Sequence, residues 1–149
     1  MKDKVLSWIL VVLWMSLIFY FSHQPATQSN GLSTGITERI IEMVERLAPK
    51  IDFDIRSMNH LIRKNAHFFI YLVLGLLLSN SLKNSKVEDR KGFIFALLIS
   101  ILYAISDEVH QLFVPGRGGQ AKDVIIDSMG SLLGIILYYK TKVLNRNRA

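Results

Sequence analysis

Four long apolar segments alternate with polar segments along the chain. Helices built from apolar stretches of about this length match the hydrocarbon thickness of a bilayer. The pattern therefore predicts an all-α integral membrane bundle of four transmembrane helices rather than an ordinary soluble fold. The predicted spans cover about 5–22, 65–82, 92–112 and 124–140.

The first segment also resembles a secretory signal peptide, because Lys2 and Lys4 precede it. Its apolar core from Val5 to Phe21 is longer than usual and contains Trp and Phe. No small-residue cleavage site precedes Pro25. We therefore interpret the segment as a transmembrane helix, which ends near Pro25 because proline disfavours helix at the residue before it.

The longest polar region is the predicted loop 23–60. Within it, apolar residues between Ile36 and Leu47 recur at helical spacing, with charged residues on the other side. This spacing predicts an amphipathic helix over about 36–47. Such a helix either lies on the membrane or the bundle, or is solvated without a specific partner, and both interpretations stay open.

Composition narrows the classes of function. Half of the 149 residues are hydrophobic, and we expect one membrane domain over 1–149. The absence of cysteine excludes disulfides, thiolate metal sites and cysteine nucleophiles. The net charge of +6 is not arranged as a Lys/Arg stripe with interleaved aromatic residues, so nucleic acid is not a predicted partner.

The distribution of basic residues predicts the orientation in the membrane. With four spans, both chain ends lie on the same side. The connection 80–91 lies on this side too. The three segments on this side contain ten of the 18 Lys and Arg residues and three acidic residues. The segments on the other side contain eight Lys and Arg residues and nine acidic residues. The positive-inside rule then places both ends in the cytoplasm, in a chain that crosses the plasma membrane several times. The loop 23–60 is then extracytoplasmic.

One polar stretch, from Ser106 to Asp127, interrupts the most apolar part of the chain. Ionisable side chains next to hydrocarbon are costly unless they face a protein interior, a cavity or a partner. The predicted spans place this stretch at the outer face, beside the start of the second helix. We expect one polar site there, which His23 can join from the first helix. Its candidate catalytic residues are His67, Asp107, Glu108, His110 and Asp127, and its candidate ligand-binding residues are Arg63, Gln111, Arg117 and Asp123.

Three interpretations of this site remain open. Adjacent carboxylates beside a histidine and an arginine can act as general base, proton relay and anion clamp. Alternatively, Asp107 and Glu108 form an ion pair with Arg117 that only closes the helix ends. A divalent cation is the third interpretation, but no pair of residues matches a zinc signature such as H-E-x-x-H. The sequence therefore predicts no cofactor, and a divalent cation stays open as the least favoured of the three interpretations.

The fourth span carries small residues four positions apart. Gly130 and Gly134 allow another helix to approach closely, and they form a candidate packing seam. Asp127 lies about one turn before this seam, so a neighbouring helix must approach it. We expect its carboxylate to face inward and to accept hydrogen bonds from an arginine or histidine of the site, or from water in the cavity.

Several motifs resemble those of the VanZ-like family of small bacterial membrane proteins. They are FYFSHQP after the first span, RKNAHFFIYLVLG in the second, SDEVHQLFVPGRGGQAKD after the third, and the D-x-x-G turn that opens the last helix. The similarity covers all four spans and leaves Thr27 to Arg56 unmatched. His23 stands where family members often have another small polar residue.

The resemblance implies a four-helix bundle with a role in the cell envelope, and the name-giving member is associated with resistance to the glycopeptide teicoplanin. It implies no reaction. We expect a site that acts on or binds the anionic head group of an envelope lipid or lipid-linked precursor, with a contribution to teicoplanin resistance, and whether the protein is an enzyme stays open. The alternatives are a non-catalytic protein that masks such a ligand or the antibiotic, and a proton-coupled carrier, which the lack of a visible internal repeat disfavours. The expected partners are membrane lipids and a lipid-linked cell-wall precursor or a glycopeptide.

Overall fold

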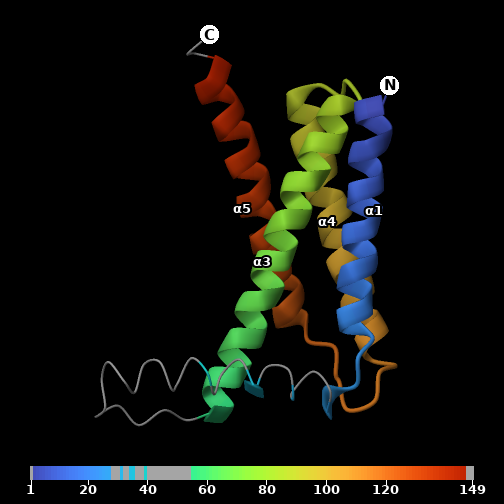
Figure 1. The fold of residues 1–149 in the computed structure, drawn as a ribbon, viewed down its shortest axis with the longest axis vertical. Coiled ribbons are helices and arrows are strands. Elements are labelled where there is room, and N and C mark those ends of the chain that lie inside the picture. Colours follow the sequence, from blue (N-terminus) through green and yellow to red (C-terminus); the bar gives the residue numbers. More distant parts are fainter. Residues whose placement is uncertain (1, 28–30, 32–33, 36–38, 40–54, 147–149) are drawn as a thin grey trace, which may run out of the picture.

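The structure is a computed structural model that describes residues 2–27, 31, 34–35, 39 and 55–146. It contains four long helices and, in the described part of the chain, no strand (Figure 1). The predicted all-α class is confirmed. The helices are α1 (Lys2–Ser22), α3 (Ile55–Asn84), α4 (Asp89–Gln111) and α5 (Ala121–Arg146).

Successive helices run in opposite directions along the bundle. The start of α1 and the end of α5 therefore lie at the same end of the molecule (Figure 1). The opposite end contains the end of α1, the first turns of α3, the α4–α5 loop and the first turns of α5. This arrangement brings together the polar segments that the sequence predicts to meet.

The helices extend beyond two of the predicted spans at this end. α3 begins at Ile55, well before the predicted start near residue 65, and α5 begins at Ala121, one turn early. The Gln120 carbonyl accepts the Asp123 amide at 2.8 Å and closes the first turn of α5. Both extensions consist largely of polar residues. A prediction from hydropathy therefore leaves them outside the spans, although the backbone there is helical.

α4 ends at Gln111, one residue before the predicted limit of its span. Beyond it, the amides of Phe113 and Val114 bond to the carbonyls three residues earlier, at 3.0 and 3.1 Å. Such bonds tighten the last turn of a helix and end its regular ladder. Pro115 follows, and the chain turns into the glycine-containing loop.

α3 and α5 pack together along the seam predicted from the glycines of α5. A Cβ atom on Gly130 would collide with the carbonyl group of Phe68, and one on Gly134 would collide with that of Leu72. A Cβ atom on Gly75 of α3 would likewise collide with the carbonyl group of Ser131 in α5. Small residues therefore allow backbone to contact backbone, and the predicted seam is confirmed.

Aromatic side chains attach α1 to the rest of the bundle. The Trp14 indole donates a hydrogen bond to the Ile70 carbonyl at 2.9 Å, and the Tyr103 hydroxyl donates one to the Met15 carbonyl at 2.6 Å. Both polar tips are thus satisfied within an apolar setting, where an unpaired donor would be costly. α1 is held against α3 and α4 together.

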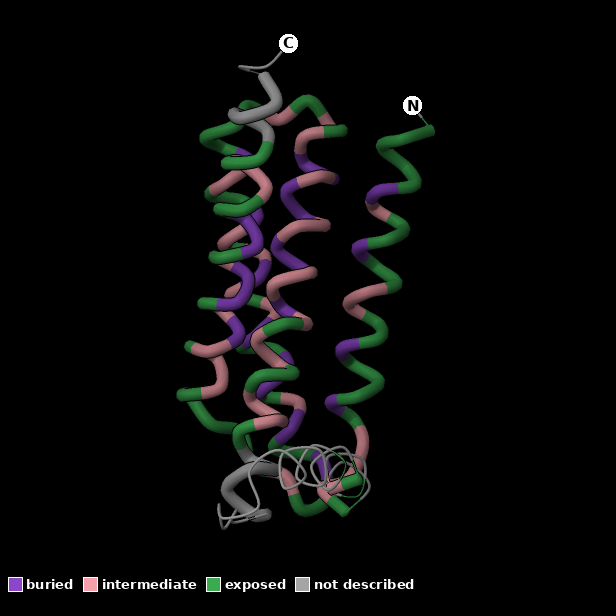
Figure 2. Tube along the Cα trace, turned by 60° about the vertical axis from the view of Figure 1, so that its left-hand side comes forward, coloured by how far each residue is buried: buried purple, intermediate pink, exposed green. Residues whose placement is uncertain are grey.

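Exposed positions follow the outer faces of the helices, and buried positions follow the inner faces (Figure 2). Many exposed side chains are large and apolar, and Phe69, Leu102 and Phe113 are 60, 67 and 80% exposed. Soluble proteins rarely present apolar surface of this extent. By length and composition, three helical segments among the described residues could cross a membrane, namely α1, the Leu61–Asn84 part of α3, and α4. These features are those of a membrane protein.

α5 is not among these three segments, although the sequence predicts a fourth span at about 124–140. Its apolar run is interrupted by Asp127 and by the small residues of the packing seam, including Ser131. Asp127 and Ser131 are both fully buried, so these polar groups face protein rather than the outside of the bundle.

The predicted loop 23–60 is described only in part, and the amphipathic helix expected over about 36–47 lies outside the described residues apart from Arg39. At the start of the loop, the Ala26 amide donates a hydrogen bond to the Pro115 carbonyl at 3.2 Å. The exit of α1 is therefore joined to the α4–α5 loop.

Candidate functional site

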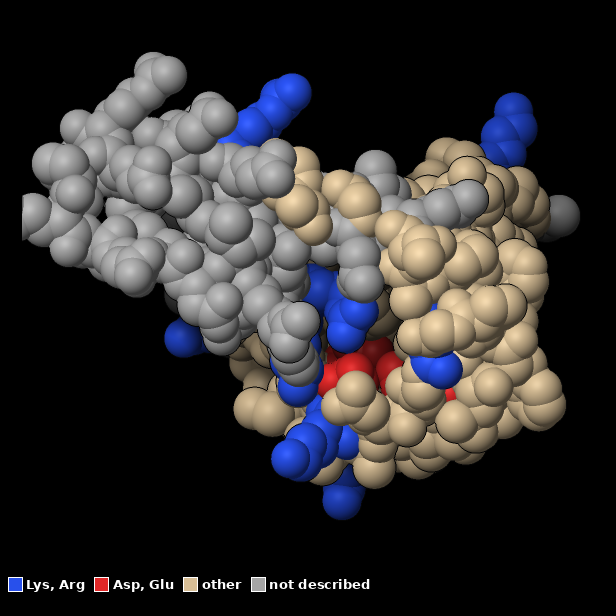
Figure 3. Space-filling model, turned by 90° about the horizontal axis from the view of Figure 1, so that it is seen from below, with Lys and Arg blue, Asp and Glu red and all other residues tan. Residues whose placement is uncertain are grey.

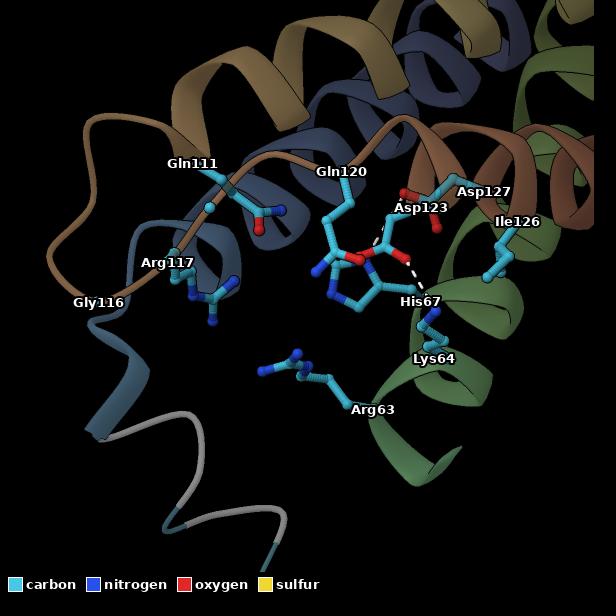
Figure 4. A pocket seen from close by; sticks show the side chains of 11 residues that line it. Arg63, Lys64, His67, Gln111, Gly116, Arg117, Gln120, Asp123, Ile126 and Asp127 are labelled. Carbon is cyan, nitrogen blue, oxygen red and sulfur yellow. Dashed lines mark ion pairs between the residues drawn. The ribbon is translucent and has the colours of Figure 1, made fainter. Parts of the chain in front are cut away.

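A pocket of about 140 Å³ lies at the end of the bundle away from the start of α1 and the end of α5 (Figure 4). The first turns of α3, the α4–α5 loop and the first turns of α5 form its walls. It contains most of the polar residues predicted to meet there. The residues that line it are Arg63, Lys64, His67, Gln111, Gly116, Arg117, Gly118, Gln120, Asp123, Ile126 and Asp127.

Three carboxylates lie deep at this end of the bundle. Asp107, Glu108 and Asp127 are only 3, 5 and 0% exposed. Viewed from this end, acidic side chains occupy the bottom of a hollow and basic side chains surround it (Figure 3). The glycine seam of α5 explains the depth of Asp127, because it brings the start of α5 against α3.

Two ion pairs connect α3 with α5, and both are marked in Figure 4. His67 Nδ1 lies 3.6 Å from Asp127 Oδ2, and Lys64 Nζ lies 3.5 Å from Asp123 Oδ1. The predicted inward orientation of Asp127 is confirmed. Its distance to His67 is that of an ion pair and is longer than a hydrogen bond.

Gln111 joins the two adjacent carboxylates of α4. Its side-chain amide donates to Asp107 Oδ2 and to Glu108 Oε1, each at 3.3 Å. The other oxygen of Glu108 accepts the backbone amide of Gln120 at 2.7 Å. Glu108 therefore holds the loop at the start of α5, whereas Asp107 keeps one oxygen, Oδ1, buried without a hydrogen-bond partner in the described chain.

Basic side chains form the mouth of the pocket. The side chains of Arg63 and Arg117 extend toward each other from opposite walls (Figure 4). Burial, and next the charge of Arg63, lower the pKa of Arg117. Two guanidinium groups held this close favour an anion between them.

Arg117 does not form the ion pair with Asp107 and Glu108 that the sequence allowed as a structural alternative. It donates instead to the Phe21 carbonyl at 3.1 Å, at the end of α1. Among the described residues, the ion pairs of the structure include neither Arg63 nor Arg117. No carboxylate of the described chain therefore pairs directly with these guanidinium groups, although Asp107 and Glu108 lie within electrostatic reach of Arg117.

His110 lies on another face of α4 from Gln111 and does not line the pocket. Its Nε2 atom is 3.1 Å from Nδ1 of His23, and its ring packs on Phe19 with 4.5 Å between ring centres. The structure thus places His110 with His23 beside α1, apart from the pocket residues.

One trio of side chains has the proximity needed to hold a metal ion. His67, Asp107 and Asp127 each offer one ligand atom, and these atoms lie within 4.8 Å of one another. The residues come from α3, α4 and α5. Only the packing of three helices brings them together, which is why no local sequence signature reveals them.

The sequence profile of the VanZ/LLP1 family matches residues 7–145, nearly the whole chain. The chain belongs to the VanZ/LLP1 family. The resemblance found in the motifs is therefore confirmed. No curated protein and no solved structure matches this chain.

Five residues that line the pocket of this VanZ/LLP1 member were not among the predicted site residues, namely Lys64, Gly116, Gly118, Gln120 and Ile126. Gly116 and Gly118 flank Arg117 in the α4–α5 loop. Lys64 lies on the same face of α3 as His67, and its helical spacing could have indicated it. Gln120 and Ile126 carry no such signal. Gln120 binds Glu108 through its backbone amide, which every residue except proline has, and Ile126 resembles any other apolar residue of α5.

Proposed function

We propose that this VanZ/LLP1 protein is a multi-pass protein of the bacterial plasma membrane with both termini in the cytoplasm. Three helices suited to crossing a membrane support the proposal. α5 packs against α3 through its glycine seam and turns its charged residue inward, so it can cross as the fourth span. The pocket then opens at the outer face.

The pocket, in this proposal, binds the anionic head group of an envelope lipid or a lipid-linked precursor. The observation that carries the proposal is the pair of guanidinium groups at the mouth, which face each other without a carboxylate partner in the described chain. Guanidinium groups bind phosphate and carboxylate through paired hydrogen bonds. Arg63 and Arg117 are thus the proposed anion clamp.

The dimensions and surroundings of the pocket also favour a lipid ligand. A volume of about 140 Å³ accommodates a small charged group but not a large hydrophobic molecule. Leu112 and Phe113, which follow the pocket residue Gln111 in the chain, are 60 and 80% exposed. A head group in the pocket would therefore leave its acyl or prenyl chains beside apolar side chains and bilayer.

Below the clamp, His67 and the buried acids can move protons. A histidine is suited to accept and release protons near neutral pH, and Asp127 lies close enough to orient its ring. This arrangement supports a catalytic role on the bound head group. Asp107, which is buried beside the same pair, is the second candidate for proton transfer.

Lipid that copurifies with the full-length protein tests the binding proposal. We expect anionic lipids to be enriched in the parent protein, and Arg63→Gln and Arg117→Gln each to lower the bound amount about tenfold, because each removes charge-assisted hydrogen bonds. Arg90→Gln is the matched control, since Arg90 is exposed at the other end of the bundle. Equal anionic lipid in all three variants would contradict the proposal.

Two conservative substitutions separate an enzyme from a protein that only masks its ligand. Asp107→Asn and His67→Gln preserve size and hydrogen bonding but remove the capacity to exchange protons. An enzyme loses turnover in both, so cells that carry either variant accumulate the same lipid as cells without the protein. A masking protein retains bound lipid and does not reproduce that accumulation. Mass spectrometry of total lipid extracts provides the measurement.

The family name suggests a link to glycopeptides, so we extend the proposal to teicoplanin. Cells that overproduce the protein should tolerate more teicoplanin than cells that overproduce Arg117→Gln. Arg90→Gln should behave as the parent, because it leaves the pocket intact. The minimum inhibitory concentration measures this effect, and an unchanged value for the parent would exclude the extension while leaving lipid binding to its own test.

A further inference from the structure

Below the arginine pair, three helices bring nitrogen and oxygen ligands to one point. We propose that His67, Asp107 and Asp127 bind one divalent transition-metal cation, such as Mn²⁺ or Zn²⁺. Their ligand atoms lie within 4.8 Å of one another, which allows all three to contact a common ion. One imidazole and two carboxylates form a donor set that suits these cations.

The buried oxygens of the two acids need a partner. Asp107 Oδ1 and both oxygens of Asp127 are buried and accept no hydrogen bond in the described chain. Asp127 is fully buried and its only ion-pair contact there is with His67, at 3.6 Å. Buried carboxylates are normally paired, hydrogen-bonded or bound to a metal, and a shared cation would satisfy all three oxygens together.

Two further groups point to the same location. The hydroxyl of Tyr71, one turn along α3 from His67, is fully buried without a hydrogen-bond partner and lies within electrostatic reach of Asp107 and Asp127. Ser22 Oγ, at the end of α1, is also buried and lies within reach of Asp107, with no other hydrogen-bond partner in the described chain. Neither group belongs to the trio. Both can support ligand oxygens or a metal-bound water around an ion.

The charges also favour a cation. With neutral His67, the two carboxylates place two negative charges inside an apolar bundle, and a divalent ion compensates both. No arginine of the described chain pairs with these acids directly, because neither Arg63 nor Arg117 is among the ion pairs. Since His67 and Asp127 line the pocket, coordination positions of the ion not filled by protein would face the pocket.

Metal binding can be measured without any lipid ligand, so its outcome is independent of the proposed lipid binding, although a bound ion would replace the proton-transfer role proposed for His67 and Asp107. The full-length protein in detergent is first treated with a chelator and then titrated with Mn²⁺, with free Mn²⁺ followed by electron paramagnetic resonance. We expect about one tightly bound ion per chain. Asp107→Asn and Asp127→Asn should each weaken binding at least about tenfold. The matched control Asp89→Asn, at the other end of the bundle, should leave binding unchanged.

A second measurement, made on the parent protein, does not depend on whether the substituted variants fold. In the parent protein, bound Mn²⁺ should show magnetic coupling to one imidazole nitrogen, and this coupling should disappear in His67→Gln. Zn²⁺ should displace Mn²⁺ from the same site. The inference is overturned if the parent binds no Mn²⁺ after chelation, if its bound ion lacks nitrogen coupling, or if Asp89→Asn weakens binding as much as the two site variants.

Discussion

The imidazole of His67 and the carboxylate of Asp127 face each other across the seam between α3 and α5, with 3.6 Å between Nδ1 and Oδ2. The His67 side chain is 25% exposed and that of Asp127 is fully buried. The pair therefore connects the pocket with the interior of the bundle. Substitutions at Asp127 affect a group that solvent does not reach directly.

We expect Asp127→Leu to impair function more than Asp127→Asn. The amide of asparagine can still contact His67, whereas leucine removes every polar atom that faces the imidazole. The measurements are folded yield in detergent and the lipid profile of cells that carry each variant. Ile125→Leu, two positions earlier on α5 and outside the pocket lining, is the volume-matched control, because it changes shape without changing polarity. Full activity of Asp127→Leu would mean that this carboxylate has no role in the site.

Glu108 should stabilise the start of α5 through its bond to the Gln120 amide. Glu108→Ala removes that acceptor and should lower the free energy of unfolding by about 1–3 kcal/mol, the cost of leaving a donor unpaired. Glu108→Gln retains a carbonyl oxygen and should keep most of the stability. Thermal unfolding and hydrogen exchange at the Gln120 amide measure the difference. Unchanged exchange in Glu108→Ala would show that the bond does not hold the loop.

Gly130→Ala should destabilise the bundle because the new methyl group would collide with the Phe68 carbonyl group of α3. Overpacking of this kind costs about 1–3 kcal/mol, and here the obstacle is backbone, which cannot rotate away. Gly118→Ala is the control for folding, since no atom of the described chain beyond its sequence neighbours lies within 4 Å of its added Cβ. If both variants unfold at the same temperature in detergent, the α3–α5 contact is looser than the structure indicates.

The proposed orientation predicts that a reporter fused after Ala149 is active only in its cytoplasmic form. A second fusion placed after Gly118 should be active only as an extracytoplasmic reporter, because the α4–α5 loop lies at the opposite end of the bundle (Figure 1). The two fusions control for each other's expression. An active extracytoplasmic reporter after Ala149 would reverse the proposed topology and place the pocket at the cytoplasmic face.

The helices could be predicted from the sequence because apolar runs and the spacing of Gly130 and Gly134 are local patterns. Most of the charged residues that line the pocket were also predictable, since charged residues beside apolar segments must be accommodated somewhere. What could not be predicted is the direction of side chains within one turn of α4. Gln111 points to the pocket and His110 points to α1, and the packing of neighbouring helices decides which of the two is included.

The same reasoning explains the trio of His67, Asp107 and Asp127. These residues are separated by long stretches of chain, and their spacing matches no signature of metal-binding or catalytic residues. Their proximity depends on how closely α3 and α5 approach and on the rotation of α4 about its axis. Both quantities are set by contacts over whole helices, which residue spacing along one segment does not contain.

The backbone contacts at Gly75, Gly130 and Gly134 have a consequence for how the family can diverge. The separation of His67 and Asp127 is set by main-chain atoms of two helices, and side chains on the outer surface do not contribute to it. Exposed apolar residues such as Leu102 can therefore change in size to suit bilayers of different thickness and composition. The exposed residues that contact the membrane can thus change while the residues that set the geometry of the pocket stay the same.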